Sequence, residues 1–66
     1  MKFKMKFKEL KSILAVTDEY KIFLKDNILF CDHETIDEVS KENGLYDKKV
    51  IFIKASDEDT LCIYLR

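Results

Sequence analysis

The stretch KVIFIKASDEDTLCIYL, residues 49–65, decides which fold this chain can adopt. Two apolar runs flank the acidic triplet 57–59, and a short polar turn between two such runs predicts a β-hairpin. A three-residue turn opposes Ser56 to Thr60 and makes one face uniformly aliphatic, whereas a one-residue slip would mix charge into that face. This face is expected to be the core side of the hairpin: Ile51, Ile53, Ala55, Leu61, Ile63 and Leu65.

An earlier hairpin is predicted from strict alternation over residues 20–25, a two-residue turn at 26–27 and a returning strand over residues 28–32. This turn pairs Leu24 with Leu29, which fixes the side chains that share each face. The core face of this hairpin is expected to carry Tyr20, Ile22, Leu24, Leu29 and Cys31.

Two helices are expected, one before the first hairpin in the chain and one after it. Apolar residues recur at helical spacing over residues 7–16, which favours a helix, although residues 3–7 also alternate as they would in a strand. A short helix is predicted over residues 36–42, because residues 35–38 fit a capping box and Asn43-Gly44 supplies a stop. Its apolar face is narrow, so we expect it to connect the two hairpins across the sheet edge.

These elements predict one small α+β domain over residues 1–66, with an N-terminal helix packed on a four-stranded antiparallel sheet of two β-hairpins and a short connecting helix. Residues 1–6 are expected to form a frayed lead-in, and the repeated Met-Lys-Phe-Lys leaves Met1 and Met5 open as translation starts. A chain of about 60 residues buries only about 60% of its unfolded surface, so its stability is expected to be marginal.

The side of the predicted sheet that faces away from the helix is strongly apolar. Aromatic side chains present about 150–250 Å² each, and ordinary monomers tolerate apolar patches of roughly 300–600 Å². We therefore interpret this side as an interaction surface, and three covers remain open: a second copy, another protein, or the chain's own short helix with segment 43–48. The predicted interface residues are Phe23, Ile28, Phe30, Val50, Phe52 and Tyr64. The candidate ligand-binding residues interspersed with them are Lys21, Lys25 and Lys54.

No catalytic or metal-binding pattern stands out in the chain. Segment 31–34, Cys-Asp-His-Glu, holds residue types that bind zinc, but no paired Cys or His spacing accompanies it. Two residues apart on a strand, Cys31 and His33 are about 7 Å apart, too far for His33 to activate the thiol. The acidic triplet 57–59 lacks the spacing of a calcium loop. We predict no metal, no cofactor and no enzymatic activity.

Charge is unevenly spread, although the formal net charge is only −1. Residues 1–25 carry seven lysines against three acids, and residues 26–66 carry five bases against ten acids. This dipolar layout suits a protein partner and is too mild to indicate nucleic acid, even with phenylalanine and lysine interleaved in residues 2–8. No apolar stretch approaches the roughly 18 residues of a membrane span and no leader is apparent, so we expect a cytoplasmic protein without a membrane partner.

Three segments carry a family resemblance: MKFKEL at 5–10, LYDKKVIFI at 45–53 and TLCIYL at 60–65. With a hairpin between the first two, the layout resembles small accessory proteins of bacterial phages and mobile elements. The resemblance implies a compact module, without an active site, that blocks, sequesters or bridges host components; some such proteins inhibit antiviral systems.

The expected function is a non-enzymatic protein-interaction module, a homodimer that inhibits or modulates an antiviral protein in the cytoplasm of a bacterial host. The alternative is a ligand sponge or nucleic-acid-binding module, in which a dimer frames a cleft lined by lysines and by Tyr20, Tyr46 or Tyr64.

Overall fold

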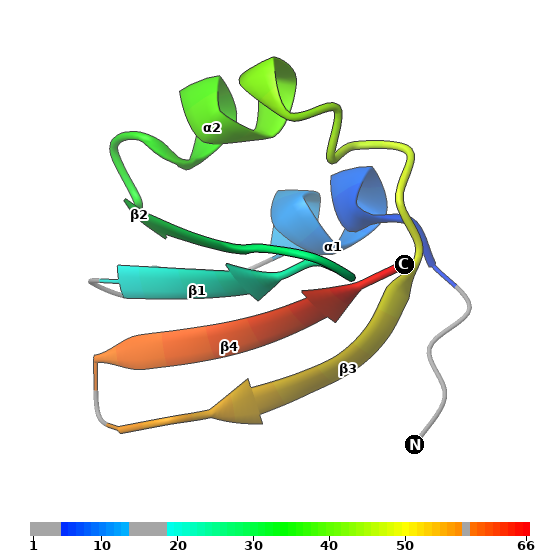
Figure 1. Cartoon of the computed structure of the whole chain (residues 1–66). Helices are drawn as coiled ribbons and strands as arrows, with labels where there is room; N and C mark the ends of the chain where they lie inside the picture. The colour runs from blue at the N-terminus through cyan, green and yellow to red at the C-terminus, as the bar shows by residue number, and fades with distance from the viewer. Residues whose placement is uncertain (1–4, 14–18, 58) are drawn as a thin grey trace.

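The computed structural model describes residues 5–13, 19–57 and 59–66 of the chain. In chain order its elements are α1 (Phe7–Ile13), β1 (Glu19–Phe23), β2 (Ile28–Asp32), α2 (Ile36–Glu42), β3 (Val50–Ala55) and β4 (Thr60–Leu65). The four strands form one layer, and both helices lie on the same side of it (Figure 1). The predicted α+β class, the two hairpins and the limits of the second helix are therefore confirmed. Residues 14–16 of the first predicted helix lie outside the described residues.

The sheet has the strand order β2-β1-β4-β3, and its two central strands, β1 and β4, run parallel. The predicted purely antiparallel sheet is therefore wrong at this one pairing. After β2 the chain crosses the helix side of the sheet through α2, forms β3 at the opposite edge and returns as β4 beside β1 (Figure 1). A hydrophobic pattern fixes which residues share a face, but it does not fix the direction in which two separate hairpins meet.

The β1–β2 hairpin differs from its predicted register by two residues. Ile22 pairs with Leu29, and the Leu24 amide donates to the Asn27 carbonyl at 2.8 Å, so the turn centres on Lys25 and Asp26. Because side chains alternate with a period of two, a shift by two residues keeps every side chain on its predicted face. Tyr20 and Ile22 accordingly lie in the core.

The β3–β4 hairpin has its predicted register from Phe52 to Ala55, but a β-bulge interrupts it between Val50 and Phe52. Beyond the bulge Val50 pairs with Leu65, which turns Val50 into the core, where its exposure is 2%, and leaves Ile51 45% exposed. The placement of Val50 on the interaction surface and of Ile51 in the core is therefore wrong. A bulge inserts one residue into a strand and exchanges the faces of the residues before it.

The start of α1 is fixed by backbone contacts with the segment that leads into β3. The Phe7 amide donates to the Lys48 carbonyl at 2.8 Å, and the Val50 amide donates to the Met5 carbonyl at 3.0 Å. Lys6 also forms a bridge with Lys49. The Phe7 amide is one that a helix start cannot satisfy internally. Met5 and Lys6 are thus part of the fold, which corrects the expected lead-in, while residues 1–4 lie outside the described residues.

Helix α2 packs on the core and does not merely connect the hairpins across an edge. Ile36 and Ser40 on its inner side are buried. The predicted capping box is absent, because the Thr35 hydroxyl donates to the Asp32 carboxylate at 3.0 Å and caps no amide of α2. The helix therefore begins from a turn that Asp32 organises.

The end of α2 follows the predicted stop. Gly44 has a φ of 60°, and the Leu45 amide donates to the Ser40 carbonyl at 2.9 Å while the Gly44 amide donates to that of Lys41 at 3.4 Å. This pair of bonds is the Schellman arrangement, which requires a left-handed residue where Gly44 stands. It directs Leu45 into the core, where the side chain is fully buried.

The core lies between the sheet and the two helices. Its buried cluster consists of Phe7, Leu10, Tyr20, Ile22, Ile36, Leu45, Val50, Ile63 and Leu65. Because Leu45 and Ile36 belong to this cluster, the short helix and segment 43–48 lie on the helix side, and the idea that they cover the opposite side of the sheet is wrong. Among the described residues, no helix is long and apolar enough to span a membrane.

Candidate interaction surface on the outer face of the sheet

The outer face is the side of the sheet opposite the helices, and an apolar row crosses it. The strand registers place Ile28 beside Phe23, Phe23 beside Tyr64, and Tyr64 beside Phe52. This aromatic row therefore has one residue from each strand, in the order Ile28, Phe23, Tyr64, Phe52. Ile28 and Phe52 at its two ends are each 44% exposed. No helix or loop of the described residues covers the row (Figure 1).

The next row combines lysines with one aromatic ring. The registers place Phe30, Lys21, Cys62 and Lys54 side by side across the four strands. Phe30 is 68% exposed, and the Lys21 ammonium lies 5.9 Å from the centre of its ring, within cation–π range. Cys62 is only 4% exposed, since longer side chains flank it on both neighbouring strands. We call this the lysine row.

Opposite charges lie at the two ends of the outer face along the strands. Lys25 and Arg66 stand two residues beyond the aromatic row, and Lys49 pairs with Arg66, which makes one end basic. Beyond the lysine row, Glu19 on β1 and Asp32 on β2 pair with each other and make the other end acidic. The face thus runs from a basic end through the aromatic and lysine rows to an acidic end.

Two aspartates at the acidic end have a pKa below the ordinary value. Hydrogen bonds from Thr35 lower the pKa of Asp32, with the Glu34 amide contributing. The Asp59 amide lowers the pKa of Asp57, which lies in the β3–β4 turn near Lys21. Hydrogen bonds to a carboxylate favour its charged form. We count Asp57 with Glu19 and Asp32 as the acidic end.

The three rings of the aromatic row contact one another. Phe23 and Tyr64 stack with ring centres 4.3 Å apart and planes 8° apart. Phe52 meets Tyr64 edge-on, at 5.6 Å and 62°. One face of the Phe23 ring and one of the Tyr64 ring are therefore covered by the stack, so the row offers less ring face to a flat ligand than three separate rings would.

The structure brings most of the sequence-predicted surface together. Five of the six predicted interface residues lie on the outer face: Phe23, Ile28, Phe30, Phe52 and Tyr64. Val50 is the exception, and the exposed Ile51, which the alternation placed in the core, was missed. Lys21 lines a hollow of about 290 Å³ that reaches Asp32 and Cys31, whereas Lys25 lies in a separate open depression at the β1–β2 turn. Lys21 and Lys25 therefore lie beside the aromatic row and do not share one pocket.

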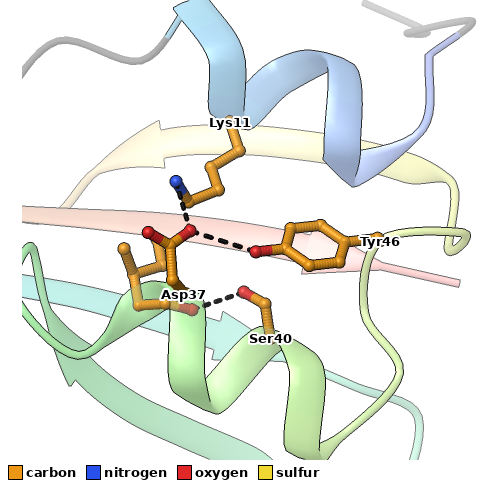
Figure 2. Close-up of polar contacts among 5 residues, drawn as sticks. Lys11, Asp37, Ser40 and Tyr46 are labelled. Atoms are coloured by element: carbon orange, nitrogen blue, oxygen red, sulfur yellow. Dashed lines mark hydrogen bonds and ion pairs between the residues drawn. The ribbon is translucent and has the colours of Figure 1, made fainter.

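A polar cluster on the helix side is a second candidate that the sequence did not indicate. Figure 2 shows Lys11 of α1 and Tyr46 both directed at the Asp37 carboxylate of α2. The Tyr46 hydroxyl donates to Asp37 at 3.0 Å, while the buried Ser40 hydroxyl donates to the Ile36 carbonyl within α2. The cluster ties α1, α2 and the following segment together.

The pKa shifts in this cluster argue for a structural role. The hydrogen bond with Asp37 raises the pKa of Lys11, and burial followed by the hydrogen bond with Asp37 raises that of Tyr46. The Lys11 contact lowers the pKa of Asp37. Each group thus moves away from neutrality, whereas an acid or base catalyst needs a pKa near the working pH.

The surroundings of Cys31 disfavour the reactive form of its thiol. Burial raises the pKa of the Cys31 thiol, and the Asp32 carboxylate acts in the same direction, so the nucleophilic thiolate is disfavoured. His33 is exposed in the turn before α2. Across residues 5–13, 19–57 and 59–66, no three Cys, His, Asp or Glu side chains gather as metal ligands would.

Known proteins offer no guide to the outer face. No protein-family model matches this chain, and neither a curated protein nor a solved structure gives a significant match. The use of this surface therefore has to be inferred from its own geometry and charge.

Proposed function

We propose that this chain is a non-enzymatic protein-interaction module whose working surface is the outer face of the sheet. The observation that carries the proposal is the uncovered pair of rows on that face. Phe30, Phe52 and Ile28 stand in contact with solvent there, at 68%, 44% and 44% exposure, and the chain's own connecting segment is packed on the other side. An exposed apolar patch rimmed by charge is typical of a protein-binding surface.

The first partner in this proposal is a second copy of the chain. A second copy that packs on the exposed apolar face removes it from water and stabilises the fold. This matters for a small domain, which buries a smaller fraction of its surface by itself than a large domain does. The dimer then acts on a bacterial host protein, most specifically on a component of an antiviral system, by occupying its surface. This host-directed part follows from the resemblance to phage and mobile-element accessory proteins.

Concentration-dependent association tests the proposal. Wild-type protein is expected to pass from monomer to dimer in light-scattering measurements as its concentration rises, while Phe30→Glu stays monomeric because it places a charge in the buried patch. Lys8→Glu on α1, an exposed position on the opposite side, is the matched control and should dimerise like the wild type. A wild-type monomer at millimolar concentration that also binds no apolar dye would refute the proposal.

A flat-ring or nucleic-acid ligand is the second candidate, because lysines lie beside aromatic rings. Base stacking needs an open ring face, and the Phe23–Tyr64 stack covers one face of each ring. The acidic end of the same face also repels a phosphate backbone. Absorbance at 260 nm in freshly purified protein, removed by high salt, would favour this candidate over protein binding.

A further inference from the structure

We infer that two copies of this chain pack outer face to outer face in one defined orientation, with their strands antiparallel and the basic end of each copy over the acidic end of the other. This inference rests on the proposed function and specifies the arrangement of its dimer. It is carried by the order of rows along the strands, which makes the face self-complementary in one orientation and self-repelling in the other.

Two symmetric arrangements can cover the face. In the first, the two-fold axis runs across the strands, between the aromatic and lysine rows, so each strand lies over the same strand of the partner in the opposite direction. In the second, the axis runs along the strands, so each row lies over the same row of the partner. Both are isologous, as closed dimers require, and both suit aligned sheet packing.

The buried apolar area does not choose between the two arrangements. Each removes the same aromatic and lysine rows from water, and the hydrophobic effect depends on area and has no direction. Four strands spaced about 4.8 Å apart and roughly 17 Å long give about 330 Å² of sheet area per subunit before side-chain relief is counted. Because this area is the same in both arrangements, charge at the rim decides between them.

Charge selects the arrangement with the axis across the strands. There, Lys25 at the basic end lies over the partner's Glu19, and Arg66 lies over the end that carries the partner's Asp57. On β2 the same arrangement brings Asp26 over the partner's Asp32, which is a repulsive contact. The basic end still carries an excess of positive charge, because three cations stand there beside Asp26: Lys25, Lys49 and Arg66. With the axis along the strands, basic end meets basic end and Glu19 meets acidic groups of the partner.

The same arrangement gives the lysine row a partner. Phe23 lies over the partner's Lys21, and Phe52 lies over the partner's Lys54, so each lysine reaches an aromatic ring. A cation over a ring gains more when it is shielded from water. Phe30 lies over the partner's Ile28, which buries the most exposed ring of the face.

Charge reversal at the two ends tests the orientation, because the two arrangements predict opposite signs. Lys25→Glu and Glu19→Lys each raise the dimer Kd, by about fivefold or more at low salt since each change affects two symmetric contacts. The double variant Lys25→Glu/Glu19→Lys restores the Kd to near the wild-type value. Sedimentation at several concentrations in 20 mM salt measures these constants, with Lys8→Glu as the control of equal charge change for Lys25→Glu.

The outcomes separate the orientation from the proposed function. If the wild type dimerises and either single reversal tightens the dimer, the axis lies along the strands and the inference is wrong while the function stands. If the wild type dimerises and the double variant is no better than the single variants, the two charges do not face each other and the inference is again wrong. If the wild type never dimerises, the self-association in the proposed function fails together with the inference.

Discussion

Val50, Ile51 and Phe52 are consecutive in β3, and only Val50 is buried, whereas Ile51 and Phe52 are each about half exposed. A β-bulge lies between Val50 and Phe52 and turns Val50 inward. Val50→Ala is expected to lower the free energy of unfolding by about 2 kcal/mol, for the apolar groups removed and the cavity left. Ile51→Ala should cost well under about 1 kcal/mol.

Urea unfolding of the two alanine variants, below the concentration at which the wild type associates, measures both costs. If Ile51→Ala lowers the free energy of unfolding more than Val50→Ala does, β3 has no bulge and the alternation predicted from the sequence is right.

Residue patterns predicted the outer face well but could not predict its exception. Five of the six predicted interface residues lie on the expected face of the sheet, because side-chain alternation survives a two-residue register shift, as the β1–β2 hairpin shows. The prediction for Val50 was wrong because the bulge consists of residue types that are common in regular strands, so the sequence does not indicate it. The polar contacts of Asp37 with Lys11 and Tyr46 were equally hidden, since they join segments whose packing only the whole fold determines.

The lowered pKa values of three aspartates predict acid sensitivity. Lys11 lowers the pKa of Asp37, and hydrogen bonds lower those of Asp32 and Asp57, all below the ordinary 3.8. A lowered folded-state pKa stabilises the fold above the unfolded value, and this contribution is lost as pH falls through the folded value. Stability should therefore decline as pH falls from about 4, and Asp37→Asn should decline less steeply.

Unfolding midpoints in urea between pH 5 and pH 2 measure the two slopes. Parallel decline of wild type and Asp37→Asn would show that the Asp37 contacts with Lys11 and Tyr46 do not form in solution.

The geometry at the C-terminal end of α2 depends on Gly44. Gly44 has a φ of 60° and nothing within 4 Å of the position where a Cβ would stand, so a side chain there meets backbone strain and no steric clash. Gly44→Ala should destabilise the fold by about 1 kcal/mol, and Gly44→Asn by less, because asparagine adopts the left-handed conformation more readily.

Thermal unfolding of the two Gly44 variants tests this order. Equal stability of the wild type and Gly44→Ala would mean that α2 ends without the Schellman bonds of Gly44 and Leu45.

At the level of elements, local chemistry predicted more than topology did. Helix 36–42, its glycine stop and the two hairpins follow from short-range signals. The parallel β1–β4 pair does not, because it depends on which way the second hairpin docks. The predicted capping box was also wrong: Thr35 is a suitable capping residue, but its hydroxyl donates to the Asp32 carboxylate and caps no amide of α2. A motif predicts a contact only where no nearer partner competes for the same group.

For the whole molecule, the central consequence of the fold is that both described helices lie on one face of the four-stranded sheet. The opposite face carries the aromatic row and the lysine row, and no described helix lies on it (Figure 1). If a second copy covers the outer face, as proposed, folding is coupled to association. The stability of such a protein depends on its own concentration, because association draws on the folded form only.

That coupling predicts a thermal midpoint that rises with concentration. At tenfold above the dimer Kd, association stabilises each subunit by about 1 kcal/mol, which corresponds to roughly 4–8 °C for a domain of this size. Phe30→Glu should remove the concentration dependence while leaving the dilute midpoint close to that of the wild type, because Phe30 is 68% exposed within its own subunit. Calorimetry over a hundredfold concentration range measures both. A Phe30→Glu midpoint far below that of dilute wild type would instead assign Phe30 to the packing of the single subunit, and the open face would then stabilise the fold itself.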